Sequence, residues 1–194
     1  MLKSTIADVF RPDERILART YDVIVVICGS LVVGLCSQIR IYLPFSPVPI
    51  TGQTFAVLML GALLGSRRGG LSMCLYLAEG LMGFPVFTSV VGPAALFGPT
   101  GGYLVGFIPA AYLVGRLAER GWDRYILSTI AAMIIGDAVL LAFGFGWLVI
   151  LTNFKTAFLT GVYPFIPGDL LKVALAAAVL PAGWKLLAYL NIRN

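Results

Sequence analysis

Long stretches of this sequence carry no charged side chain. Residues 23–39 and 80–115 contain no Asp, Glu, Lys or Arg. A helix that crosses the hydrocarbon core of a bilayer needs about 20 predominantly apolar residues. Over the whole chain 59% of residues are hydrophobic and only 12% are charged, whereas a soluble domain is roughly a quarter charged. Lipid must therefore solvate much of the surface, and 194 residues have room for about six spans.

Prolines and glycines divide the apolar segments into separate helices. Pro44, Pro47 and Pro49 exclude a continuous helix, because proline lacks an amide donor and disfavours helix in the residue before it. The pattern predicts an all-α polytopic membrane protein, a single domain over residues 1–194 with a cytoplasmic N-terminal segment over residues 1–20. The six predicted spans cover approximately residues 22–42, 54–65, 71–84, 101–117, 125–147 and 165–190.

The basic residues fall into two groups when six spans are drawn. Eleven lie on one side of the membrane, in the N-terminal arm, the 66–70 loop, the 116–124 hairpin and the C-terminal end. Only Arg40 and Lys155 lie on the other side, and Lys172 lies within a span. Because basic residues mark cytoplasmic loops, both termini are predicted to be cytoplasmic, in a plasma (inner) membrane protein. The net charge of +5 thus reflects topology and does not predict nucleic-acid binding.

The predicted outer loops differ in character from the inner loops. Residues 42–53, 85–100 and 148–164 are rich in Pro, Gly and aromatic residues and carry almost no charge. Non-helical backbone near membrane depth is tolerated only where it is buried in protein or lines a cavity. Two interpretations follow: the loops are lids over an outward-facing pocket, or they are ordinary connectors.

Four ionisable residues lie within predicted spans: Glu79, Asp137, Asp169 and Lys172. A charge at that depth is costly unless it is paired or faces water, so each is a candidate functional residue. Asp169 and Lys172 are three positions apart and share one helix face, where they can contact a small polar ligand or simply pair with each other. Glu79 can join the same pocket or make a helix–helix hydrogen bond, and for Asp137 an interhelical partner is expected.

Polar residues stand where the outer loops enter the second and fourth predicted helices. Thr51, Gln53, Thr100 and Tyr103 are candidates for ligand contact there, since the free N–H groups of helix starts suit polar ligand groups. Aromatic residues nearby are candidates for the apolar walls, although each can equally be an interfacial anchor. These aromatic residues are Phe84, Phe87, Phe97 and Tyr103.

Small residues recur four positions apart, a spacing that lets helices approach closely. Most of these pairs are expected to pack inside the bundle, but Ser30 and Gly34 can instead face a partner protein. The other pairs are Gly61 and Gly65, Gly102 and Gly106, and Ala111 and Gly115.

Several chemical motifs are absent from the sequence. It has no His, no P-loop, no nucleophile elbow, and its three cysteines have no metal-ligand spacing. No catalytic residue and no metal site is predicted. If transport is driven by ATP, the ATPase must be another chain.

Four ordered motifs together resemble the BioY family, the biotin-specific substrate-binding (S) components of energy-coupling factor (ECF) transporters. The resemblance covers about residues 20–190. The motifs are Pro47-Val48-Pro49-Ile50-Thr51-x-Gln53, Tyr76-Leu77-Ala78-Glu79-Gly80-x-x-Gly83-x-Pro85-Val86-Phe87, Gly98-Pro99-Thr100-Gly101-Gly102-Tyr103-Leu104-x-Gly106-Phe107 and Pro167-Gly168-Asp169-x-x-Lys172.

The resemblance implies a six-helix S component that binds biotin at its outer face and takes part in high-affinity biotin uptake. Residues at the positions of Asp169 and Lys172 take part in the family's biotin site. Ser30 and Gly34 lie where the family carries a small-xxx-small motif that contacts the transmembrane coupling subunit, although here the residues are Ser and Gly rather than Ala. The implied partners are that coupling subunit and two ATPase subunits; no cofactor is implied.

Two alternatives remain at this level. The same scaffold can serve a different vitamin, or the intramembrane carboxylates can act as acid–base groups of an enzyme. Biotin suits the residues, because its ureido ring offers two N–H donors and an acceptor, its thiophane ring needs apolar walls and its tail ends in a carboxylate. Binding of biotin to the purified chain would distinguish these hypotheses.

Overall fold

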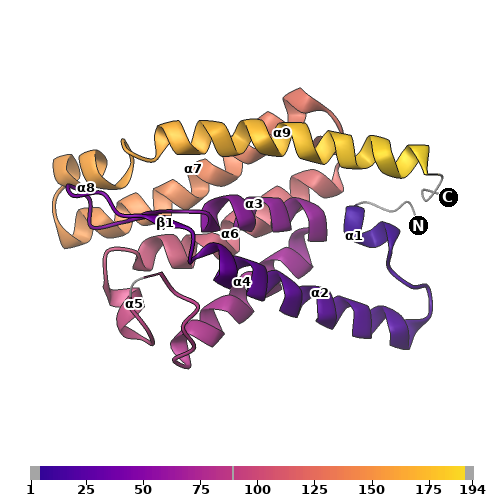
Figure 1. The fold of residues 1–194 in the computed structure, drawn as a ribbon, viewed down its shortest axis with the longest axis horizontal. Helices are drawn as coiled ribbons and strands as arrows, with labels where there is room; N and C mark the ends of the chain where they lie inside the picture. The colour runs from indigo at the N-terminus through magenta and orange to yellow at the C-terminus, as the bar shows by residue number, and fades with distance from the viewer. Residues whose placement is uncertain (1–4, 89, 191–194) are drawn as a thin grey trace.

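The computed structural model describes residues 5–88 and 90–190, which form a mostly helical bundle. Figure 1 shows that the long helices run along the bundle and that different short elements lie at its two ends. Helix α1 and the C-terminal end of α9 lie at one end of the bundle, and α5, α8 and strand β1 lie at the other. We call the second of these the loop end.

Short helices and two short strands connect the long helices of the bundle. In chain order the elements are α1 (Ile6–Val9), α2 (Arg15–Cys36), β1 (Arg40–Ile41), β2 (Ile50–Thr51), α3 (Gln53–Leu64), α4 (Ser66–Leu81), α5 (Ala94–Phe97), α6 (Gly101–Glu119), the 3-10 helix η1 (Trp122–Arg124), α7 (Ile126–Leu151), α8 (Phe154–Gly161) and α9 (Ile166–Tyr189). In the described part of the chain, α2, α6, α7 and α9 are the four helices long and apolar enough to cross a membrane, and α3 is a shorter apolar helix.

The first long helix differs from its predicted range of residues 22–42. It begins at Arg15 and ends at Cys36, where the Ser37 hydroxyl donates to the Gly34 carbonyl at 2.7 Å. The chain then forms a short antiparallel ladder in which Arg40 pairs with Thr51. The proline-containing loop lies between these two strands, so the end of the predicted span is extended backbone rather than helix.

The predicted break at residues 66–70 is shorter than expected. Gly65 adopts φ +85°, a left-handed conformation that glycine accepts without steric cost, and α4 begins at the next residue. The Glu119 carboxylate accepts hydrogen bonds from the Ser66 amide at 2.8 Å and from its hydroxyl at 2.7 Å. One glycine and one distant carboxylate therefore replace the predicted loop.

Two of the predicted outer loops are partly helical. Residues 85–100 contain α5, and residues 148–164 contain the end of α7 together with α8. The Asn153 side chain caps α8 by accepting from the Thr156 amide at 2.9 Å. Helical turns satisfy backbone groups locally, which suits segments close to a bilayer.

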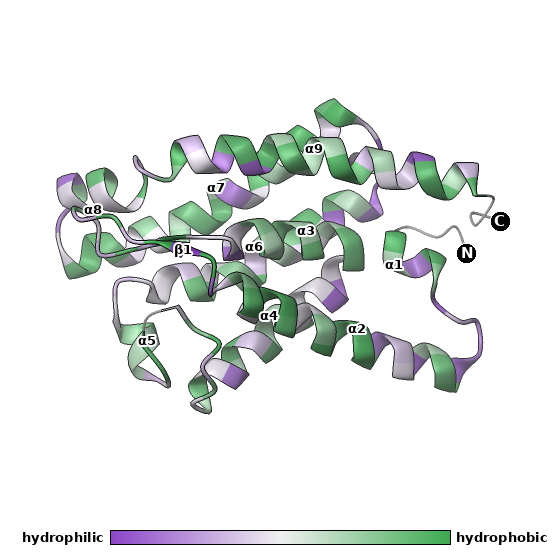
Figure 2. Ribbon diagram, viewed as in Figure 1, coloured by the Kyte–Doolittle hydropathy of each residue, from purple (hydrophilic) through white to green (hydrophobic). Residues whose placement is uncertain are grey.

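Helix α6 lies at the centre and packs against α3, α4 and α7. Glycines permit these close approaches: a Cβ added at Gly61 would lie 2.6 Å from the Ala111 carbonyl oxygen, and one at Gly106 would lie 2.8 Å from the Phe143 Cβ. The long helices consist mostly of apolar residues, as Figure 2 shows, and many of their apolar side chains are exposed. Leu35 is 71% exposed and Leu127 is 82% exposed. Such surfaces require a lipid solvent.

Ion pairs hold the end of the bundle that carries the chain termini. Arg68 pairs with Asp8 of α1 and with Asp22 of α2, and Asp22 also pairs with Arg11 at 2.8 Å. The chain before α2 is thereby fixed to α4.

Asp123 offers a test of packing at the same end. Its buried carboxylate accepts from the Trp184 indole N–H at 2.6 Å, and burial raises the pKa of Asp123 from 3.8 to about 6. The native state therefore holds the proton more tightly than the unfolded state, so the contribution of Asp123 to stability falls as pH rises from about 4 to about 6 and then stays level.

We expect Asp123→Asn, which cannot ionise, to exceed the wild type in Tm by a margin that grows over that range. Thermal unfolding of both proteins in detergent measures it; a margin independent of pH would contradict the assignment.

Candidate functional site

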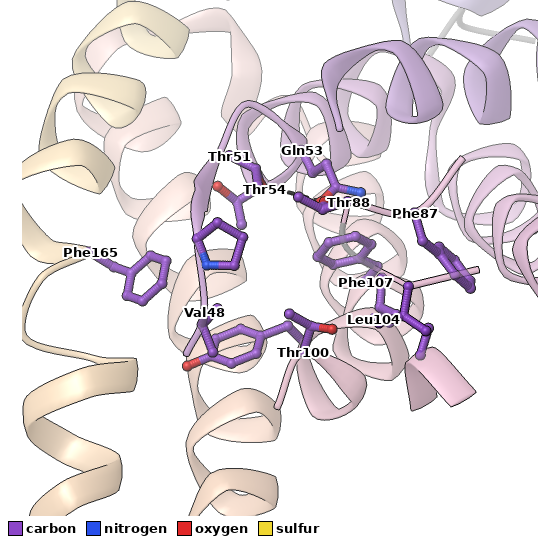
Figure 3. A pocket seen from close by; sticks show the side chains of 14 residues that line it. Val48, Thr51, Gln53, Thr54, Phe87, Thr88, Thr100, Leu104, Phe107 and Phe165 are labelled. Atoms are coloured by element: carbon purple, nitrogen blue, oxygen red, sulfur yellow. Dashed lines mark hydrogen bonds between the residues drawn. The ribbon is translucent and has the colours of Figure 1, made fainter. Parts of the chain in front are cut away.

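A pocket with about 480 Å³ of empty space, part of which is open to solvent, lies at the loop end of the bundle. Its walls are mainly apolar, with a few hydroxyl groups and one amide, the composition typical of small-molecule sites. Figure 3 shows side chains converging on it from the segment before α3, from the 85–90 segment, from the start of α6 and from Phe165. The lining residues are Val48, Pro49, Thr51, Gln53, Thr54, Phe87, Thr88, Val90, Ala95, Thr100, Tyr103, Leu104, Phe107 and Phe165.

Gln53, the first residue of α3, is the polar centre of one wall. Its buried carbonyl oxygen accepts from the Thr88 hydroxyl at 2.9 Å and from the Thr51 hydroxyl at 3.3 Å, and its amide nitrogen donates to the Tyr76 hydroxyl. Tyr76 in turn donates to the Val86 carbonyl at 3.1 Å. One amide thus joins α3, α4 and the segment after α4.

Tyr103 and Phe165 form the opposite side of the pocket. Their ring centroids are 6.0 Å apart, and the buried Tyr103 hydroxyl donates to the Gly161 carbonyl at the end of α8. The Ser46 hydroxyl reaches the same helix, where it lies 2.6 Å from the Thr160 carbonyl oxygen. Helix α8 therefore holds both Tyr103 and the chain that carries Val48.

Phe87 closes the pocket near α4. Its ring is buried and stands edge-on to the Tyr76 ring, with centroids 5.4 Å apart. The ring lies directly against Gly80, where any Cβ would overlap it. The glycine of the sequence motif therefore makes room for the aromatic residue of the same motif.

The charged pair lies next to this pocket rather than in its lining. The Lys172 ammonium contacts Asp169 Oδ1 at 2.9 Å and donates to the Thr54 hydroxyl at 2.7 Å. Thr54 lines the main pocket, so it connects the pair to it. The second carboxylate oxygen of Asp169 is buried and has no hydrogen-bond partner among the described residues.

A second, smaller cavity lies among α3, α7 and α9. Asp169 and Lys172 line it, and so does Asp137 from α7. Two acidic side chains and one ammonium thus line a mostly apolar cavity. Ionisable residues within membrane-spanning helices are rare, and each is a candidate functional residue.

The sequence-predicted site residues occupy three places. Thr51, Gln53, Phe87, Thr100 and Tyr103 line the main pocket, while Asp169 and Lys172 line the adjacent cavity. Glu79 lies in neither lining.

Glu79 instead accepts a hydrogen bond from Ser30 of α2 at 3.0 Å. Ser30 is fully buried and Gly34 packs beside Val86, so both small residues lie against neighbouring parts of this chain. Two aromatic candidates, Phe84 and Phe97, are 56% and 74% exposed and do not line the pocket.

Sequence reasoning missed several pocket residues. Thr54 follows Gln53 directly, and its place in the first turn of α3 is a usable signal. Val48 and Pro49 lie within one of the four motifs, but the motif alone does not assign them to the site. Thr88 and Phe165 stand in irregular segments, where no periodicity indicates which way a side chain points.

The groups at the site suit binding rather than catalysis. Within residues 5–88 and 90–190 there is no group of three or more His, Cys, Asp or Glu side chains that could hold a metal ion. What the pocket offers is an apolar interior with hydroxyl groups, an amide and a nearby ion pair. Such a site can hold a small ligand with an apolar body and a polar head.

Comparisons with known proteins agree on one group of relatives. Residues 10–189 match the model of the BioY family. The biotin transporter BioY of Rhizobium etli is 38% identical over 165 residues, covering 80% of this chain and 88% of that protein. The biotin transporter BioY of Thermotoga maritima is 38% identical over 147 residues, covering 72% and 82%.

A solved structure resembles most of the chain. It is the crystal structure of the S-component for biotin from an ECF-type ABC transporter. The TM-score is 0.74 at 26% sequence identity, and the match covers 86% of this chain and 92% of that chain.

The contact between Gly80 and Phe87 can be tested by adding one methyl group. Gly80→Ala forces the Phe87 ring to move, and overpacking of this kind costs about 1–3 kcal/mol. We expect a lower Tm in detergent. Gly146→Ala is the matched control, because nothing lies within 4 Å of a Cβ at Gly146. Equal Tm values for the two variants would show that Phe87 does not depend on Gly80.

Proposed function

The chain belongs to the BioY family, and we propose that it is the membrane-embedded subunit that binds biotin during high-affinity biotin uptake. The observation that carries the proposal is the family match over residues 10–189 combined with a mainly apolar pocket at the loop end. The relatives are named as transporters, and the chain is a transporter component, not an enzyme.

The pocket and the charged pair beside it together offer a place for each part of biotin. Val48, Phe107 and Phe165 surround the thiophane ring and the tail with apolar surface. Thr51, Gln53 and Thr100 are close enough to the cavity to meet polar groups of the ligand. Phe87 and Tyr103 close the walls through their buried rings.

We assign the ureido ring to the charged pair beside Thr54. The buried Asp169 Oδ2 atom has no partner among the described residues, so it is free to accept a ureido N–H. Lys172 already donates to Thr54 and can donate to the ureido carbonyl from the same position. For Glu79, the hydrogen bond to Ser30 supports the other predicted role, a contact between helices.

If ATP drives uptake, its hydrolysis takes place on other chains, since this sequence has no nucleotide-binding loop. We propose that the partners are an ECF transmembrane coupling subunit and two ATPase subunits. Helix α2 is the proposed contact with the coupling subunit. Ser30 and Gly34 allow α2 to lie close to its neighbours, while Leu31 and Leu35 between and beside them are exposed.

The proposed topology has six membrane crossings with both termini in the cytoplasm. The distribution of basic residues supports it, and so does the position of both described chain ends at one end of the bundle. The pocket then opens toward the outside of the plasma membrane.

Equilibrium binding of labelled biotin to the purified chain in detergent tests the function. We expect tight binding by the wild type and a loss of about 10- to 100-fold in Asp169→Asn and in Lys172→Ala, the range for a hydrogen bond to a charged group. Lys155→Ala, which removes an exposed ammonium on α8, should bind as the wild type does.

The outcomes separate the function from the site. A wild type that does not bind biotin, or that binds another vitamin more tightly, would overturn the function. Unchanged binding in both site variants would leave the function standing and refute the role of the charged pair.

Single cysteines test the topology. After Cys28, Cys36 and Cys74 are replaced, Lys155→Cys should react with a membrane-impermeant maleimide in whole cells. Arg67→Cys should react only after the cells are opened; both positions are exposed on the protein. Labelling of residue 67 from outside would refute the cytoplasmic placement of that turn.

A further inference from the structure

The charges near the pocket are not evenly balanced. Lys172 is paired with Asp169, and the carboxylate of Asp137 lines the same small cavity. Arg40, at the loop end, makes no salt bridge with any acidic residue in the described ranges. A second cation at that end, Lys155 on α8, is exposed.

Two independent contacts place Arg40 at the rim of the main pocket. In the antiparallel ladder it stands directly opposite Thr51, and side chains that face each other across such a pair lie on the same side of the ladder. Thr51 lines the pocket. The Arg40 guanidinium also donates to the backbone carbonyl of Thr88. Thr88 lines the pocket too, from the segment that follows α4.

Contacts hold the Arg40 guanidinium in place but do not use all of its N–H groups. Its carbon lies 5.6 Å from the centre of the Tyr42 ring, a cation–π contact that fixes its position. Nη1 donates to Thr88, and the remaining N–H groups have no acidic partner among the described residues. A guanidinium with free, parallel N–H groups matches a carboxylate in a bidentate manner.

The charged pair is a poor site for a second anion. A ligand carboxylate beside Lys172 would be a second negative group around an ammonium that Asp169 already neutralises, and the acidic side chain of Asp137 lines the same cavity. Burying an uncompensated charge costs several kcal/mol. At Arg40 the same carboxylate would neutralise a free cation near solvent.

We propose that Arg40 binds the carboxylate of the ligand at the rim of the pocket and selects the free acid over its ester or amide. The inference rests on the proposed function, with the ureido head directed toward Asp169 and Lys172 and the tail toward Arg40. A cation provided by the ladder before α3 thus adds specificity that the apolar walls do not have.

Two ligands distinguish this role from a structural one. Affinities for biotin and for biotin methyl ester are measured for the wild type and for Arg40→Gln at neutral pH. The wild type should prefer biotin by about 10- to 100-fold. Arg40→Gln should lose that factor for biotin and keep the wild-type affinity for the ester, so that its ratio of affinities approaches one.

Two further variants serve as controls. Arg40→Lys keeps the charge and should retain a preference for the acid, although a smaller one, because an ammonium lacks the planar fork. Lys155→Gln removes the other cation of the same end and should leave the ratio unchanged.

The proposal is overturned if Arg40→Gln lowers the affinity for biotin and for the ester by the same factor, since Arg40 would then only hold the Thr88 segment in place. It is also overturned if Arg40→Gln leaves both affinities unchanged, or if Lys155→Gln abolishes the preference instead. If Arg40→Gln does not fold, loss of the preference in a folded Arg40→Lys protein overturns it as well. A wild type that binds neither ligand overturns the proposed function itself.

Discussion

Backbone carbonyl groups near a bilayer must find donors within the protein, and this constraint organises the loop end of the molecule. The irregular segments around the pocket and the last turn of α8 leave carbonyl groups that no helical hydrogen bond satisfies. Side chains from different parts of the chain donate to them instead. The donor and acceptor pairs are Gln38 with Pro85, Arg40 with Thr88, Ser46 with Thr160, Tyr76 with Val86, Tyr103 with Gly161 and Trp147 with Gly98.

These bonds have a consequence for ligand binding. Several walls of the pocket are anchored to another wall, and Gln53 connects two of them through a single amide group. Close packing of α6 against α3, α4 and α7 then sets the distance between the anchored walls. A pocket held in this way is largely formed before a ligand arrives, which reduces the ordering cost of binding. The charged pair beside Thr54 adds a polar group to an otherwise apolar interior.

Much of the fold could be predicted because membrane helices leave a strong one-dimensional signal. Helices α2, α3, α4, α6, α7 and α9 each overlap one of the predicted ranges. The ends were predicted less well. The prediction extended the first helix through Arg40, whereas hydrogen bonding to a partner strand makes that residue extended. It also placed a loop at residues 66–70, whereas Glu119, distant in the chain, caps a helix there.

For the site residues too, contacts within one helix could be predicted and contacts between helices could not. Asp169 and Lys172 contact each other as predicted, because two residues three apart on one helix are neighbours whatever the rest of the fold does. Glu79 and Ser30 meet across two helices, and no local rule indicates which residue on α2 faces α4.

The sequence by itself determined that the chain is a membrane protein, roughly which segments are helical and which charged residues lie in those segments, since these depend on composition and short-range spacing. Only the tertiary structure decided which walls meet, that Thr54 joins the ion pair to the pocket, and that Arg40 reaches Thr88. Those contacts join residues far apart in the chain, and their geometry depends on how closely the helices pack.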